Sequence, residues 1–155
     1  MKHLELRDVQ FAELTLHTGV GNFRDIEVED LTKHKADSEQ MEVTEEASKI
    51  FNAASARESK ICAVGTTTLR ALETASTANG EIKPFEGWTN RFIFPPYQFT
   101  TANCLISNFQ LPYSMMLMNQ ASFGGYEQVM NAYDIALKEG YRFGFYGDAL
   151  LILPD

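Results

Sequence analysis

Three threonines in a row follow a glycine where an apolar run of the sequence gives way to a helical pattern. Residues 60–65 predict a buried strand, and the segment after Gly65 predicts a helix that contains Arg70. The first turn of a helix has unpaired N–H groups and a partial positive charge. Hydroxyls beside them suit a carboxylate, a phosphate or a ribose hydroxyl. Gly65, Thr66 and Thr67 therefore form a candidate binding turn, although it is not a P-loop because the Gly-Lys-Ser/Thr ending is missing.

A structural interpretation of the same turn stays open. One threonine can cap the helix while the others face solvent, which accounts for one hydroxyl better than for three. Arg70 can pair with an anionic ligand or with an acidic side chain of the protein.

The loop at residues 17–23, called here the glycine loop, is the second candidate. Gly19 and Gly21 stand one residue apart after a predicted strand, so the backbone there can approach a ligand closely. His17 has the side chain that changes charge near neutral pH. A single Gly-x-Gly without a third glycine and a following helix is weak support for dinucleotide binding. On spacing alone, His17 is better explained as an ordinary residue at the end of a strand.

Two further polar stretches carry side chains suited to binding. Asn108 and Gln110 are two residues apart, so on an extended segment both amides point the same way and can read the edge of a base. Hydrogen bonds that stabilise a turn before Pro112 explain the same residues equally well. Asp148, among aromatic residues, can place a carboxylate in a pocket or can bond its own backbone as a turn residue.

The elements that must position these residues alternate between strand and helix, which predicts an α/β fold with a mixed sheet and flanking helices. We expect one compact domain over residues 1–155. Strands are predicted at 11–17, 26–28, 41–43, 60–65 and 91–99, with a pair of short strands around Gly147-Asp148. A second apolar run follows at 103–112 and is broken at Pro112. Helices are predicted after the N-cap Thr44, at 66–80 with Asn79-Gly80 as the stop, near 117–123, and at 126–140.

The composition narrows the class of protein. The 155 residues are 45% hydrophobic and 12% aromatic, which predicts a folded domain, and no apolar run approaches the roughly 20 residues of a membrane span. We expect a cytoplasmic protein. Cys62 and Cys104 form no Cys-x-x-Cys pair, so neither a disulfide framework nor a zinc site is indicated, and Cys62 is expected to be buried. The net charge of −8 disfavours diffuse binding to nucleic-acid phosphates, which would need a local basic patch.

Taken in this order, the stretches resemble the S-adenosylmethionine:tRNA ribosyltransferase-isomerase family of queuosine biosynthesis. The resemblance covers nearly the whole chain, and four motifs in order are a strong signal where each one singly is not. The matching segments are Thr15-Leu16-His17-x-Gly19-x-Gly21-x-Phe23, Ala63-Val64-Gly65-Thr66-Thr67-x-x-Arg70-x-Leu72-Glu73, Asn108-Phe109-x-Leu111-Pro112-x-Ser114, and Tyr141-Arg142-Phe143 with Tyr146-Gly147-Asp148-Ala149-x-Leu151-Ile152.

The resemblance implies that the ribosyl part of S-adenosylmethionine moves to a 7-aminomethyl-7-deazaguanine base in a tRNA anticodon. Adenine and methionine leave, and epoxyqueuosine results. A base must remove the C5′ proton that the sulfonium activates, and acid/base help is needed as adenine departs and the epoxide closes. S-adenosylmethionine is a cosubstrate, and no other cofactor and no metal is implied because the sulfonium supplies the electrophilic activation. The implied partners are S-adenosylmethionine and, through the full-length protein, tRNA, with no membrane.

The resemblance also assigns roles by position. His17 and Asp148 are the candidates for the catalytic site, His17 as acid or base and Asp148 in the pocket wall. The implied cosubstrate-binding residues are Gly19, Gly21, Gly65, Thr66, Thr67, Arg70, Asn108, Gln110 and Ser114.

The chain departs from the family pattern at several positions. The family normally has threonine at Asn22, histidine at Asp37 and Gln110, and aspartate at Asn103, and Gln110 cannot shuttle protons. Members are about twice this length, so the chain is expected to be the C-terminal α/β portion, inactive alone and without the N-terminal half. Two other functions stay open: a binding module that has lost catalysis, and a transferase that acts on a free nucleoside.

Overall fold

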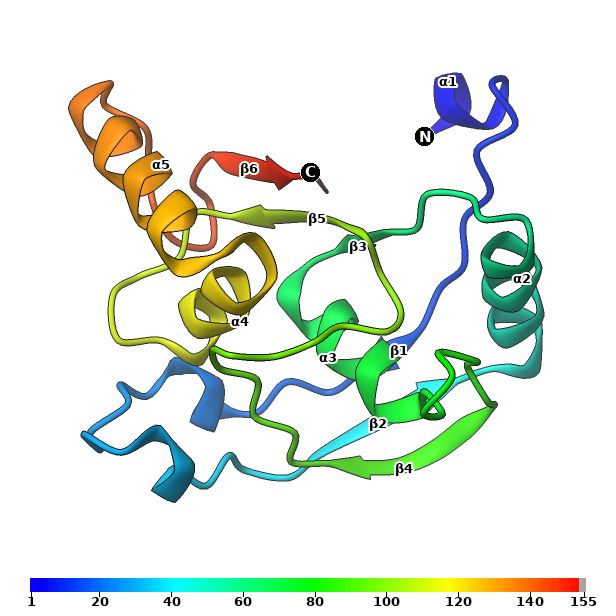
Figure 1. Ribbon diagram of the computed structural model, residues 1–155, viewed down its shortest axis with the longest axis horizontal. Helices are drawn as coiled ribbons and strands as arrows, with labels where there is room; N and C mark the ends of the chain where they lie inside the picture. The colour runs from blue at the N-terminus through cyan, green and yellow to red at the C-terminus, as the bar shows by residue number, and fades with distance from the viewer. Residues whose placement is uncertain (154–155) are drawn as a thin grey trace.

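Two three-stranded sheets with helices around them make up the protein in a computed structural model that describes residues 1–153 (Figure 1). The mixed α/β fold class predicted from the sequence is confirmed, although the strands divide between two sheets. None of the helices in the described part of the chain is long and apolar enough to cross a membrane.

The first sheet is antiparallel, with strand order β1-β2-β4. Its members are β1 (Thr15–Leu16), β2 (Glu39–Val43) and β4 (Phe85–Thr89). Side chains alternate along β2, so Glu39, Met41 and Val43 all face the interior. A charged side chain thus shares the buried face of this strand with two apolar ones.

The second sheet is the mixed one, with order β3-β5-β6. It contains β3 (Cys62–Val64), β5 (Cys104–Asn108) and β6 (Ala149–Ile152). β3 and β5 run parallel, and β6 pairs antiparallel with β5. Ala63 and Leu105 lie opposite each other on the buried face, and β3 leads directly into α3 (Thr66–Ala75).

The remaining α-helices are α1 (Lys2–Glu5), α2 (Glu45–Ala56), α4 (Met115–Gly124) and α5 (Tyr126–Lys138). Two short 3-10 helices, Val20–Phe23 and Leu31–Lys33, lie in the segment between β1 and β2. The predicted cap Thr44 begins α2, where its hydroxyl accepts from the N–H of Ala47 at 3.1 Å. One apolar cluster joins α2, α3 and both sheets, and a second joins α5 to α4 and Phe109. Ile152 packs against both.

Five expectations from the sequence are wrong, and local chemistry explains most of them. Residues 26–28 and 91–99 are not strands, and in the second segment Pro95 and Pro96 leave two consecutive residues without a donor. Helix α3 ends at Ala75, because Asn79-Gly80 closes a tight turn instead. A single strand, β6, follows Gly147-Asp148, and Cys62 is exposed rather than buried.

Strand β4 was not expected from the sequence. Proline precedes it and Gly87 lies within it, and its outward residues include Trp88 at 66% exposure. These features obscure the alternation of polar and apolar residues by which an isolated strand is recognised.

Candidate functional site at the carboxyl ends of the parallel strands

Three of the four predicted polar stretches meet at one edge of the β3-β5-β6 sheet. The carboxyl ends of parallel strands share an edge, so the turn after β3 lies near the segment after β5, and Gly65 donates its N–H to the Ile106 carbonyl at 2.7 Å. The antiparallel β6 begins at the same edge, where the Asn108 amide donates to the Gly147 carbonyl at 3.0 Å. Ligands of α/β proteins bind outside this edge of the sheet.

The turn that begins α3 leaves hydrogen-bonding groups without protein partners. Gly65 has φ +96°, which favours glycine, and no side chain caps the helix. Thr68 bonds its hydroxyl back to the Val64 carbonyl at 2.8 Å. The hydroxyls of Thr66 and Thr67 make no hydrogen bond within residues 1–153, although Thr66 is only 4% exposed. The turn therefore has the N–H groups and hydroxyls with which a helix start holds an anion or a sugar.

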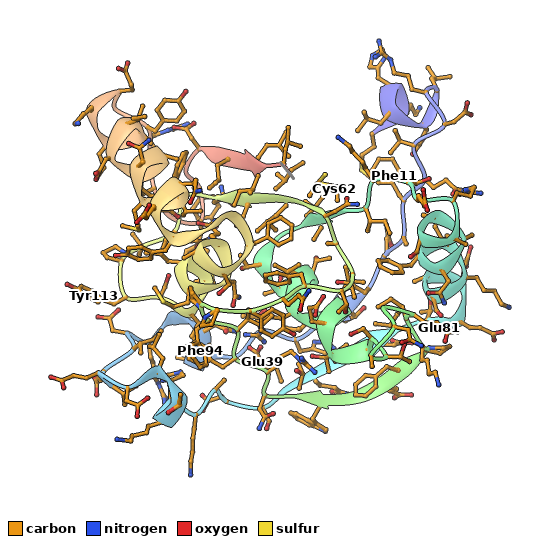
Figure 2. All side chains as sticks on the ribbon, viewed as in Figure 1. Phe11, Glu39, Cys62, Glu81, Phe94 and Tyr113 are labelled. Atoms are coloured by element: carbon orange, nitrogen blue, oxygen red, sulfur yellow. The ribbon has the colours of Figure 1, made fainter. Side chains whose placement is uncertain are left out.

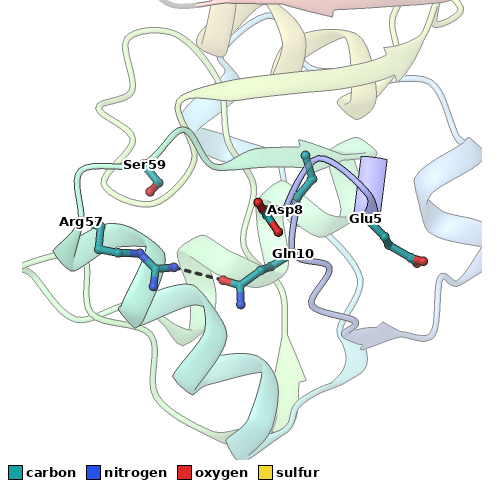
Figure 3. Close-up of a pocket in the computed structure, with 6 residues that line it drawn as sticks. Glu5, Asp8, Gln10, Arg57 and Ser59 are labelled. Atoms are coloured by element: carbon teal, nitrogen blue, oxygen red, sulfur yellow. Dashed lines mark hydrogen bonds between the residues drawn. The ribbon is translucent and has the colours of Figure 1, made fainter. Parts of the chain in front are cut away.

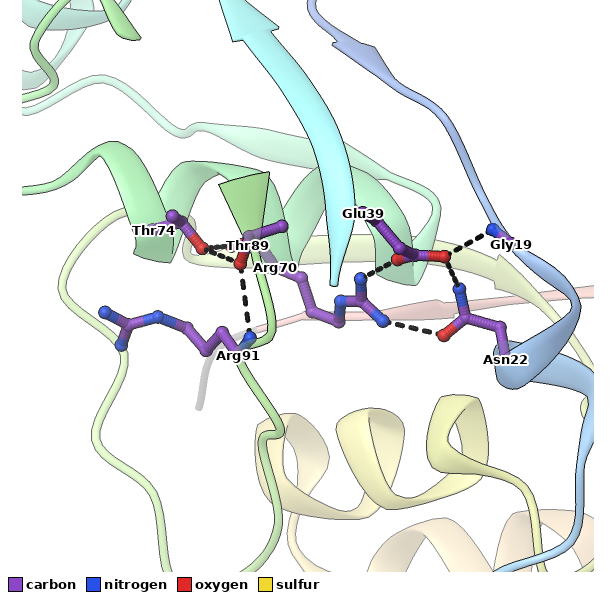
Figure 4. A network of polar contacts seen from close by, with 7 residues as sticks. All are labelled: Gly19, Asn22, Glu39, Arg70, Thr74, Thr89 and Arg91. Carbon is purple, nitrogen blue, oxygen red and sulfur yellow. Dashed lines mark hydrogen bonds and ion pairs between the residues drawn. The ribbon is translucent and has the colours of Figure 1, made fainter. Parts of the chain in front are cut away.

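A buried polar network ties this helix to the glycine loop (Figure 4). Arg70 and Glu39 form an ion pair in which each side chain is 3% exposed. Arg70 also donates to the Asn22 amide oxygen at 2.7 Å, and Asn22 donates to Glu39. The other Glu39 contact is the N–H of Gly19, at 2.6 Å. Helix α3, strand β2 and the glycine loop are thereby joined through three side chains and one backbone donor.

This network settles one of the alternatives that the sequence left open. Arg70 pairs with an acidic side chain of the protein, and its guanidinium lies below the surface. Its Nε atom has no hydrogen-bond partner in the described chain. The direct contact of Arg70 and Gly19 with the cosubstrate stays a prediction, while the position of both is fixed by Glu39.

A cavity of about 420 Å³ lies beside Gly21. A side-chain carbon at Gly21 would come within 2.2 Å of the Asp37 carboxylate, so any other residue at this position would displace the exposed Asp37 side chain. Charged side chains of both signs, Arg24, Asp25 and Lys35 among them, line the same cavity. The glycine loop therefore borders a polar cavity, as close backbone approach to a ligand requires.

The two predicted catalytic residues occupy open positions. His17 is exposed at the end of β1, and its backbone N–H bonds the Gln40 carbonyl at 2.8 Å. Asp148 accepts from the N–H of Arg142 at 2.8 Å and keeps 38% of its side chain exposed, which matches the turn interpretation. No hydrogen bond or ion pair joins His17 to Asp148 within residues 1–153, so their shared role in catalysis stays a prediction.

The polar side chains of the stretch after β5 make hydrogen bonds within the protein. Buried Gln110 donates its side-chain amide to the Ser107 hydroxyl at 3.1 Å, so it does not point into solvent beside Asn108. Ser114 is the N-cap of α4 and accepts from the N–H of Leu117 at 3.2 Å. Ligand contacts by these residues stay predictions, and the structure gives each a folding role.

Sequence reasoning missed two buried carboxylates that organise the site. Glu39, labelled in Figure 2, belongs to the buried face of β2 together with Met41 and Val43. A charged residue at a position where the alternation predicts an apolar one was the available signal. Glu73 is 2% exposed on α3 and accepts from the backbone N–H groups of Thr100 and Thr101, both at 3.1 Å. Its second oxygen accepts from the Tyr97 hydroxyl at 3.0 Å. Burial and the neighbouring Glu73 carboxylate raise the pKa of Tyr97.

A larger cavity, of about 520 Å³, lies away from this edge (Figure 3). The N-terminal segment and the end of α2 line it, and Arg57 donates to Gln10 across it at 3.0 Å. None of the predicted site residues lines this cavity. No group of three or more His, Cys, Asp or Glu within residues 1–153 is placed to hold a metal ion.

The strand-end turn, the glycine loop and the network between them form a candidate site for a small polar ligand in an α/β protein. Residues 1–152 match the family model described as "Queuosine biosynthesis protein", and the chain belongs to that family. The resemblance drawn from the four motifs is confirmed.

Curated relatives carry the name S-adenosylmethionine:tRNA ribosyltransferase-isomerase. The chain is 63% identical to the one from Bacteroides fragilis and 61% identical to the one from Parabacteroides distasonis, and each match covers 99% of this chain and 44% of the relative. A crystal structure of S-adenosylmethionine tRNA ribosyltransferase from Thermotoga maritima is 38% identical, with a TM-score of 0.80, over 98% of this chain and 48% of that one. The chain thus spans less than half the length of these relatives.

Proposed function

We propose that this chain supplies the S-adenosylmethionine-binding edge of an S-adenosylmethionine:tRNA ribosyltransferase-isomerase. The observation that carries the proposal is the start of α3, where the hydroxyls of Thr66 and Thr67 have no protein partner in the described chain and no side chain caps the helix. A carboxylate or a ribose hydroxyl fits such a turn because the unpaired N–H groups donate while the hydroxyls donate or accept. S-adenosylmethionine carries both groups.

The buried network places the glycine loop beside this turn. Glu39 holds the backbone of Gly19 and the side chain of Arg70 together, so the loop and α3 keep a fixed relation. His17, the first residue of the loop, is the proposed acid or base, and its exposure leaves it reachable by a substrate. Asp148 is proposed to border the same site. S-adenosylmethionine acts as cosubstrate, and no resident cofactor is proposed.

Transfer RNA is the proposed acceptor, and the cytoplasm the proposed location. The chain has a net charge of −8, so its contribution to the tRNA surface must be local. Arg24, His34 and Lys35 gather at the cavity beside the glycine loop. The carboxylates of Asp25, Glu27 and Asp37 line the same cavity, so the surface that this chain would offer to tRNA there is mixed in charge.

One observation favours a second candidate, a binding module without catalysis. The side chain of Gln110 stands where the family pattern has histidine, and here it is 7% exposed and donates to Ser107. A buried amide cannot move protons, so the chemistry would have to depend on His17 and Asp148 alone.

The test joins this chain to the remaining portion of the Bacteroides fragilis relative. Release of adenine from S-adenosylmethionine is measured with tRNA that carries the 7-aminomethyl-7-deazaguanine base, with unmodified tRNA and without tRNA. Release that needs the modified tRNA supports the transferase. In a further arm the free 7-aminomethyl-7-deazaguanine nucleoside replaces tRNA, and release there supports the free-nucleoside enzyme instead. Binding measured by calorimetry without release in any arm supports the binding module.

A further inference from the structure

The β3-β5-β6 sheet buries one face against helices. Ala63 and Leu105 lie in the apolar core, and Leu150 and Ile152 pack against the cluster that α5 contributes to. Because side chains alternate along strands, the residues between these point to the opposite face. The pairing register of the three strands therefore determines which side chains lie on the opposite face.

That opposite face carries a row of apolar side chains across all three strands. Val64 lies opposite Ile106, and Ile106 lies opposite Leu151. Their exposed fractions are 64%, 36% and 55% in the same order. Cys62, two residues before Val64, points to the same face and is also exposed. A sheet face left to solvent normally carries polar residues at these positions, so the row is typical of a face that packs against another surface.

The length of the relatives indicates what covers it. They have more than twice the length of the segment that this chain matches, and the match runs through the whole sheet. We propose that the Val64–Ile106–Leu151 face packs against the remaining portion of the family's polypeptide. The inference rests on family membership and on the exposed row. It does not depend on the chemistry proposed at the α3 turn.

The exposed thiol supplies the test. Cys62 lies beside the row and is exposed, whereas Cys104 is 4% exposed, so one fast-reacting thiol is expected from this chain. The remaining portion of the Bacteroides fragilis relative is produced with its cysteines replaced by serine and is mixed with this chain. Reaction of Cys62 with an aromatic disulfide reagent is then followed, with Cys62→Ser to confirm the assignment. We expect co-elution and at least a tenfold slower reaction in the complex.

Substitutions locate the contact. Val64→Lys and Leu151→Lys should abolish both co-elution and protection, and circular dichroism checks that each variant folds. The matched control is Leu137→Lys on α5, a leucine of 62% exposure outside the row, which should leave both unchanged.

Three results would overturn the proposal. The complex could form while Cys62 reacts as fast as in the free chain, which would place the contact on another face. Protection that rises with the concentration of this chain alone would assign the face to a second copy. If the two pieces do not assemble, a single fused polypeptide is labelled instead, and unprotected Cys62 there rejects the proposal. Loss of adenine release with intact protection would count against the proposed function only.

Discussion

Thr66, Thr67 and Thr68 are chemically alike, yet the fold uses them differently. Thr68 satisfies its hydroxyl on the Val64 carbonyl, while the hydroxyls of the other two have no partner among residues 1–153. Thr66 is buried in spite of this. Two hydroxyls without protein partners, next to a helix start that no side chain caps, favour a ligand that pairs with them.

Binding of S-adenosylmethionine by the joined protein should depend on Thr67. Thr67→Val preserves shape and removes the hydroxyl, and we expect the binding free energy to weaken by about 1–3 kcal/mol because a buried hydrogen bond is lost. Thr68→Val is the matched control and should leave the dissociation constant unchanged, since that hydroxyl already serves Val64. Calorimetric titration measures both. Equal dissociation constants for wild type and Thr67→Val would remove the turn from the site.

The ion pair between Glu39 and Arg70 should be a large contributor to stability. Glu39→Gln leaves a buried guanidinium without its counter-charge, and we expect a loss of about 3–5 kcal/mol in the free energy of unfolding. Urea denaturation measures it. The control is Glu45→Gln, which breaks an ion pair with Lys49 in which both side chains are more than 70% exposed and should change nothing measurable. Similar midpoints for the two variants would contradict the buried role.

At the scale of elements, the sequence predicted what depends on neighbours along the chain. The helical patterns after Thr44, Gly65 and Gly125 each produced a helix, because caps and apolar stripes are local signals. Local signals could not predict the partners of Glu39, because Asn22 and Arg70 lie 17 and 31 residues away from it along the sequence. The aromatic run at residues 91–99 looked like a strand, but its backbone donors have no neighbouring strand to meet.

The turn after α3 provides a test of packing between elements. Gly80 has φ +78°, and a side-chain carbon there would lie 2.5 Å from the Thr100 carbonyl oxygen. Gly140 has φ +76° and nothing within 4 Å. Gly140→Ala should therefore cost only the backbone strain of about 1–2 kcal/mol. We expect Gly80→Ala to lower the unfolding free energy by more than Gly140→Ala does, because of the added clash with Thr100. Thermal denaturation compares the two variants. Equal losses of unfolding free energy in the two variants would show that the structure relieves the clash at position 80 without cost.

The contact between α4 and α5 depends on a protonated phenol. Tyr133 accepts from the Gln110 N–H and donates to the Gln120 side chain, and burial raises its pKa to about 12 from a usual value of 10.0. Since the folded pKa is the higher one, the stabilisation is complete below pH 10 and declines as the pH rises toward 12.

Tyr133→Phe isolates this effect from other groups that titrate in alkali. At pH 8 the variant should be less stable than wild type because Gln120 and the Gln110 N–H lose their partner. Between pH 10 and 12 the difference should narrow, as measured by urea denaturation at several pH values. A difference that stays constant across this range would mean that the phenol does not titrate with folding.

On the scale of the whole molecule, two sheets and two apolar clusters support one edge where the polar stretches gather. Ile152 contacts both clusters, so both of them support the buried face of the sheet that carries the edge. The net negative charge is a second property of the whole molecule. With a net charge of −8, the molecule repels polyanions overall, and at the cavity beside Gly21 the cations Arg24 and Lys35 stand among carboxylates.

This balance predicts how the chain behaves with tRNA. By itself it should show no saturable binding to unmodified tRNA at about 0.15 M salt, because phosphate contacts by few cations do not offset the overall repulsion. The joined protein should bind, and Lys35→Glu should weaken that binding and flatten its salt dependence by about one phosphate contact. Fluorescence anisotropy at several salt concentrations measures both. Lys138→Glu, at the end of α5 and away from the cavity, is the control and should keep the wild-type slope. Tight, salt-sensitive binding by the chain alone would instead show that its cations suffice against the acidic surface.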